Sequence, residues 1–236
     1  SQAGWFWAND AQTRSFFHAA EAGLPYIALL RYLQAFPQAG NAQQVRQGLV
    51  RGLQAEISIT GRGPGNPFGY PRQYVQMPGQ QGAGQPAPQQ QGQVQFFFPH
   101  QNESGYWWQG ENARLASLAA AALWTARLLD GADPLAVQLK PYAQDALDWI
   151  FGRNPFDTCM MQGQGHNNPR YESGYFNAPG GVCNGITSGL DDEADIDFKL
   201  PNQTTPSHSW RWNEQWLLHG AWLFLALAQV DSTSSN

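Results

Sequence analysis

"NARLASLAAAALWTARLL", residues 112–129, is an alanine- and leucine-rich run with no glycine or proline to interrupt it. Its apolar residues recur every three or four positions: Leu115, Leu118, Ala122, Ala126 and Leu129. This is the period of an α-helix that buries one side. The stretch therefore predicts a long helix, and the segments around it must cover its apolar side.

Segments on both sides of this run repeat the helical period. The pattern predicts further helices over residues 11–36, 42–59, 134–151 and 210–230, with a kink or a break at Pro25. About five or six helices with little strand alternation indicate an all-α protein. The length of 236 residues fits one domain with a substantial core.

Charge and composition exclude two classes of partner. The formal net charge is −5, and the 13 lysines and arginines form no basic run, which argues against nucleic-acid binding. No apolar run approaches the ~20 residues that span a bilayer, so we expect no membrane partner. Cys159 and Cys183 fit either a disulfide in an exported protein or two buried free thiols. We expect an extracellular or periplasmic protein.

The long loops differ in composition. Residues 79–95 are rich in Gln, Gly and Pro, and we expect a flexible, exposed insertion there. Residues 96–112 and 154–209 combine aromatic and polar side chains. Because long ordered loops at helix ends more often form sites than decorate them, these two loops are the predicted walls of a site.

Four stretches then resemble a known family in their order along the chain. They are "WWQGENARLASLAAAAL" (107–123), "DWIFGRNPFDTCMMQGQG" (148–165), "SGLDDEADIDF" (188–198) and "WNEQWLLHGAWLFLAL" (212–227). Together they resemble the C-terminal half of family 9 glycoside hydrolases, whose fold is an (α/α)6 toroid of helical hairpins. The resemblance implies that residues 1–236 are the C-terminal portion of a single catalytic domain, about half of such a toroid. A missing N-terminal segment or a companion chain would complete it.

The resemblance also implies a role for Glu214. Asn213-Glu214 matches the Asn-Glu that opens the last helix of the family and carries the catalytic acid. The flanking rings of Trp210, Trp212 and Trp216 would desolvate this carboxyl and raise its pKa toward the range of a general acid. The alternative is a helix-start glutamate that interacts with the helix dipole.

An inverting glycosidase also needs a base, which lies roughly 6.5–9.5 Å from the acid and activates a water. The family supplies that base from an N-terminal Asp motif that this chain lacks. The resemblance therefore implies inverting hydrolysis of β-linked, glucan-type oligosaccharides or polysaccharides, with Glu214 as the acid and a base from the missing part.

Sugars bind to flat aromatic rings and to hydrogen-bonding side chains. The predicted substrate-binding residues are His100, Glu103, Trp107, Trp108, His166, Arg170 and Trp212. Of Trp107 and Trp108, adjacent at a helix start, we expect one in the site and the other in the core. Arg170 is retained where the family has a His-His-Arg cluster, but the histidine pair is absent.

Other classes of function and cofactor stay open. A polysaccharide lyase would recruit His100, His166 or Tyr171, and a glycan-binding subunit would need no catalytic residue. The acidic run over residues 191–197 fits a solvated loop, a structural Ca²⁺ site or a substrate contact through Asp191 or Asp192, although it lacks the pattern of an EF-hand. No cofactor is expected to be required, and no metal-ligating residues are assigned, because the histidines and cysteines do not cluster as zinc ligands do.

Overall fold

The computed structural model describes residues 4–12, 15–75, 92–97, 110–169, 177–187 and 212–231. In chain order the elements are α1 (Leu24–Ala35), α2 (Ala42–Thr60), β1 (Gln73–Val75), β2 (Gln93–Gln95), α3 (Glu111–Leu128), α4 (Pro134–Ile150) and α6 (Leu217–Asp231). The two short strands pair antiparallel, with Gln73 opposite Gln95. The described part of the chain is therefore mostly helical, as the sequence predicts.

The helix α3 is the centre of the core. Every residue from Glu111 to Leu123 is buried, so the helix is enclosed on all sides rather than along one stripe. It packs against α4, α6 and α1. Its many alanines allow close approach: Gly23, just before α1, lies so near Ser117 that a Cβ would fall 2.1 Å from the Ser117 carbonyl oxygen.

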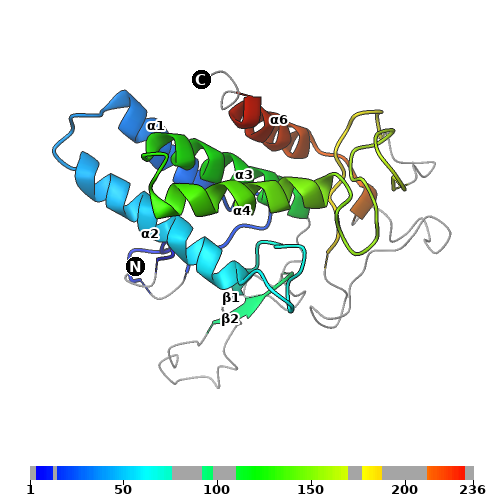
Figure 1. Cartoon of the computed structure of the whole chain (residues 1–236), viewed down its shortest axis with the longest axis horizontal. Coiled ribbons are helices and arrows are strands. Elements are labelled where there is room, and N and C mark those ends of the chain that lie inside the picture. Colours follow the sequence, from blue (N-terminus) through cyan, green and yellow to red (C-terminus); the bar gives the residue numbers. More distant parts are fainter. Residues whose placement is uncertain are drawn as a thin grey trace.

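The helices form two rows (Figure 1). The helices α1, α3 and α6 lie in one row, and α2 and α4 lie in the other, with α2 beside α1 and α4 beside α3. The helices α1 and α3 run in the same direction, since Gly23 contacts Ser117 and, further along, Arg31 lies over the Trp124 ring. The pairs α1–α2 and α3–α4 are antiparallel hairpins with short connections. In the first pair, Tyr26 contacts Glu56 and Tyr32 contacts Asn41.

The helix ends depart from the prediction in two places. Residues 11–12 and 15–23, which the helix was predicted to include, are not helical, because Gly23 and Pro25 set the start of α1 and the preceding segment pairs Ser15 with Trp7. At the other end of the chain, α6 begins at Leu217 and not at residue 210. Residues 93–95, predicted to belong to a flexible insertion, instead form β2, because their backbone pairs with β1.

The two ends of the bundle differ. Among the described residues, one end carries the short connections over residues 36–41 and 129–133. At the other end α2 stops at Gly61, which adopts the left-handed conformation (φ 55°), and the long loops begin. Within the described residues, no helix combines the length and apolar character that a membrane span requires.

Candidate functional site

The backbone around Glu214 is tied to the start of α3 through the segment 183–185. Asn112, in the first turn of α3, donates through its side-chain amide to the Cys183 carbonyl (2.8 Å) and through its backbone N–H to the Asn184 carbonyl (3.0 Å). The Asn184 N–H then donates to the Glu214 carbonyl at 2.9 Å. Since Asn112 is fully buried, this chain of hydrogen bonds places Glu214 relative to the core.

The residues on both sides of Glu214 are also held. The Asn177 side chain donates to the Asn213 carbonyl at 2.5 Å. The Gln215 amide accepts from the Ala178 N–H (2.7 Å) and donates to the Gly181 carbonyl (3.1 Å). The turn that carries Glu214 is therefore fixed by loop 177–187 on one side and by α3 on the other.

The Glu214 carboxylate belongs to a partly exposed residue. Within the described part of the chain it has no hydrogen-bond or ion-pair partner. The arrangement thus combines a fixed backbone with an unengaged carboxylate, which is what a side chain needs to act on a ligand.

Glu214 lies before α6 rather than in its first turn. Gln215 forms an isolated antiparallel bridge with Cys183, and this extended pairing keeps residues 214–216 out of the helix. The sequence placed Glu214 at a helix start, so the prediction was wrong by about one turn. The dipole of α6 is correspondingly a poorer explanation for the glutamate, because its effect falls off within the first turn.

The neighbouring tryptophans have different environments. Trp212 is 0% exposed and belongs to the hydrophobic core, so no part of its ring is left for the predicted sugar contact. Trp216 is partly buried and stacks on His219, with ring centroids 5.4 Å apart and an interplanar angle of 21°. Trp216 is the indole that remains accessible beside Glu214 among the described residues.

His219 supports the same turn from inside the protein. It is fully buried, and its Nδ1 accepts a hydrogen bond from the Trp216 N–H at 3.2 Å. Burial lowers the pKa of His219 to about 4, so the imidazole is neutral at mild pH. Because Nδ1 is an acceptor, the proton of the neutral ring lies on Nε2, which has no hydrogen-bond partner.

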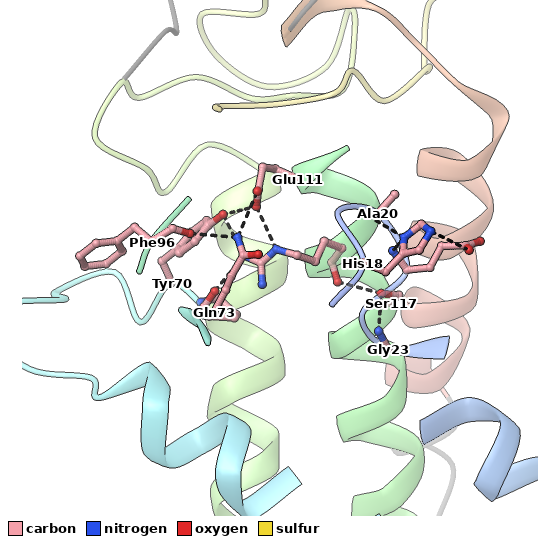
Figure 2. A network of polar contacts seen from close by, with 11 residues as sticks. His18, Ala20, Gly23, Tyr70, Gln73, Phe96, Glu111 and Ser117 are labelled. Carbon is pink, nitrogen blue, oxygen red and sulfur yellow. Dashed lines mark hydrogen bonds and ion pairs between the residues drawn. The ribbon is translucent and has the colours of Figure 1, made fainter. Parts of the chain in front are cut away.

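A second cluster at this end of the bundle is a buried ion pair (Figure 2). Glu111 accepts hydrogen bonds from Tyr70, from Arg114 (3.0 Å) and from Gln73 (3.2 Å). Arg114 also donates to the Pro71 carbonyl at 2.8 Å. Burial raises the pKa of Tyr70 well above its usual value, so the phenol stays protonated and donates. This network fixes residues 70–73 to α3.

The remaining predicted substrate-binding residues cannot be grouped around Glu214. His100, Glu103, Trp107, Trp108 and Arg170 lie outside the described residues, as does the acidic run with its suggested Ca²⁺ site. His166 is described: it is exposed, and its Nδ1 lies 2.9 Å from an Asp157 carboxylate oxygen. Its role in substrate binding stays a prediction.

Both cysteines are free and buried. The segments that carry them pair antiparallel, with a bridge between Met161 and Val182 and a hydrogen bond from the Cys183 N–H to the Met160 carbonyl (3.1 Å). Cys183 faces Met160, with its sulfur 3.7 Å from the methionine sulfur. Burial raises the pKa of Cys183 to about 12, which keeps it an unreactive thiol.

Some of the residues that build the site carry no motif in the sequence. Asn184 and Gln215 act through hydrogen bonds between segments far apart in the chain, and Tyr70 reaches Glu111 across 41 positions. The one sequence feature that points to them is their place at helix ends and in long loops. No group of three or more metal-ligating side chains occurs among the residues that the structure describes.

Comparison of the chain with protein-family models and with curated proteins finds no match.

Proposed function

We propose that this chain carries the acid-bearing part of an inverting glycoside hydrolase, with Glu214 as the general acid. One observation carries the proposal: three of the stretches that resemble family 9 meet around Glu214. Asn112 from the first stretch binds segment 183–184, which pairs with Met160 of the second stretch and with Glu214 and Gln215 of the last. These contacts fix the backbone at Glu214 and leave its carboxylate unengaged within the described part of the chain, which supports a role for that carboxylate toward a ligand.

The proposed chemistry follows from what Glu214 can exchange. In its protonated form the carboxyl gives its proton to the glycosidic oxygen as the bond to the sugar carbon breaks. A water, activated by a carboxylate on the opposite face, forms the new bond to that carbon and inverts it. Trp216 lies two residues after Glu214, and its partly accessible ring could offer an apolar platform for the sugar that Glu214 protonates.

The proposed partner supplies the base and completes the helical array. Exposed apolar residues run along one side of α6 at helical spacing: Leu217, Ala221, Phe224 and Ala228. Leu217 is 91% exposed and Phe224 is 76% exposed, which is unusual for side chains of this size on a core helix. The two rows of helices support a toroid built from alternating inner and outer helices, in which α6 would be an inner helix.

We propose that this stripe, called here the α6 stripe, receives a helix from an N-terminal segment or a companion chain. Each of α1 and α3 has a helix of the other row packed against it, α2 and α4 respectively, whereas α6 packs chiefly against α3 among the described elements. The same segment would bring the catalytic base to the face opposite Glu214.

Product analysis of the complete protein tests the activity. The protein, purified with any companion segment, is incubated with a panel of β-linked glycans, and the products are examined by mass spectrometry and ultraviolet absorbance. Hydrolysis adds one water for each bond cleaved, and this is the expected result. An unsaturated sugar would indicate a lyase instead, and binding without any product would indicate a glycan-binding subunit.

A further inference from the structure

A half-open cavity of about 340 Å³ lies where the end of α4 faces the loop after α2. Its lining includes six aromatic side chains: Phe68, Tyr70, Phe96, Phe97, Trp149 and Phe156. The Phe68 and Trp149 rings meet edge to face, with centroids 5.9 Å apart and an interplanar angle of 86°. These rings come from four separate segments of the chain, so the fold builds the cavity rather than one local sequence.

Of the three polar side chains in the described lining, those of Asn66 and Tyr70 are already engaged. The Asn66 amide donates to the Thr60 and Tyr70 carbonyls and accepts from the Tyr70 N–H. The Tyr70 hydroxyl donates a hydrogen bond to Glu111 and accepts one from Arg114. The Trp149 indole N–H is buried within the protein and out of reach of a ligand. Among the described lining residues, no accessible polar side-chain group is left to bind a ligand hydroxyl.

A sugar ring and an aromatic ring would therefore differ in their free energy of binding to this cavity. A pyranose would bring several hydroxyl groups, and each one buried without a partner costs about 1–3 kcal/mol. A flat aromatic ring carries no such cost, and it gains from edge-to-face and offset contacts with the lining. The chemistry of the lining therefore favours an aromatic ligand over a sugar.

We infer that this cavity is a binding site for a planar aromatic group of one or two fused rings. A buried apolar cavity of about 150 Å³ suffices for benzene, and the volume here is roughly twice that. Ile186 lines the cavity, and the preceding Gly185 N–H donates to the Trp212 carbonyl at 3.1 Å. The aromatic site and Glu214 are thus joined by one segment. The inference concerns binding alone and does not depend on the proposed hydrolysis.

Calorimetric titration of the complete protein with 2-naphthol tests the inference. Saturable binding with one site is expected, and methyl β-D-glucopyranoside should bind at least tenfold more weakly. Phe156→Ala and Phe68→Ala should each weaken 2-naphthol binding at least tenfold, because each removes one wall of the cavity. Phe151→Ala is the matched control, because Phe151 is near Phe156 in sequence but is not among the residues that line the cavity. This variant should bind 2-naphthol with unchanged affinity.

Several results would overturn the inference. They are the absence of saturable 2-naphthol binding to folded protein, stronger binding of the glucoside, or an unchanged affinity in both cavity variants. If Phe156→Ala fails to fold, Phe156→Leu serves in its place and should weaken binding about threefold. Glu214→Gln should bind 2-naphthol normally, which separates this site from the proposed catalysis.

Discussion

The neutral imidazole of His219 makes the stability of the protein depend on pH. The folded-state pKa is about 4, below the value of about 6.5 for an exposed histidine. As the pH falls from 6.5 toward 4, the unfolded chain binds a proton that the folded chain does not, so stability is lost. Above pH 6.5 His219 is neutral in both states and does not lower the free energy of unfolding. At pH 4 the difference in proton binding lowers the free energy of unfolding by about 3 kcal/mol.

We therefore expect His219→Gln to flatten the pH dependence of unfolding between pH 6.5 and 4. Urea unfolding at several pH values measures this, and His166→Gln is the control, since that histidine is exposed. A wild-type slope that His219→Gln leaves unchanged would show that His219 is not buried in neutral form.

The ion pair of Glu111 and Arg114 should be costly to break on one side. Both side chains are almost completely buried, so Arg114→Met leaves an uncompensated carboxylate and should lower the free energy of unfolding by about 3–5 kcal/mol. Glu111→Gln in the same protein should recover a large part of that loss. Arg153→Met, at a half-exposed ion pair with Asp148, should cost less than about 1 kcal/mol.

A double-mutant cycle from chemical unfolding measures these values. Equal losses for Arg114→Met and Arg153→Met, or no recovery in the double variant, would contradict the structural role given to the buried pair.

At the scale of elements, the α6 stripe should decide association. Phe224→Lys places a charge where the proposed partner helix would pack, and it should weaken assembly with the completing segment at least tenfold. The same change should reduce self-association of residues 1–236 alone, because less apolar surface is exposed. Val137→Lys is the control, since Val137 is a 57% exposed residue on α4.

Analytical ultracentrifugation with and without the completing segment distinguishes the outcomes. Assembly that is equally strong with Phe224→Lys and Val137→Lys would mean that the α6 stripe is not the contact surface.

Helix interiors were predictable from the sequence, but helix ends and the site were less so. The helices α2, α3 and α4 lie within one or two residues of their predicted bounds, because long apolar periods and the prolines and glycines that flank them are local features. The start of α6 was not predicted correctly, because the pairing of Gln215 with Cys183 competes with the helix. This pairing joins residues far apart in sequence, so local periodicity does not reveal it.

The candidate site shows the same limit. The sequence indicated Glu214 through its place in an ordered set of stretches, and it also indicated that loops would surround it. It did not indicate that Asn112 and Asn184 fix the turn that carries Glu214. It also did not indicate that Trp212 is buried in the core and inaccessible to a sugar. These depend on tertiary packing, which periodicity and composition do not encode directly.

At the scale of the whole molecule, residues 1–236 expressed alone should be inactive and poorly folded. The α6 stripe would remain exposed, and a general acid without a base leaves the attacking water unactivated. Addition of the completing segment should restore a cooperative thermal transition and activity together. A monodisperse, active protein made of residues 1–236 would contradict this, and the base would then be sought within the chain, first at Glu103 and Asp191.

The central claim is that Glu214 donates the proton in an inverting hydrolysis, and the most direct test is the rate and stereochemistry of one reaction. The complete protein and its Glu214→Gln variant are compared by proton NMR on a β-linked glycan with a poor leaving group, with Glu21→Gln as the control. We expect the wild type and Glu21→Gln to release the α-anomer first. Glu214→Gln should bind the glycan but turn over at least ~10²-fold more slowly, because the amide keeps the shape and loses the proton. Glu214→Gln that retains most of its activity, or a wild type that releases the β-anomer first, would contradict the account.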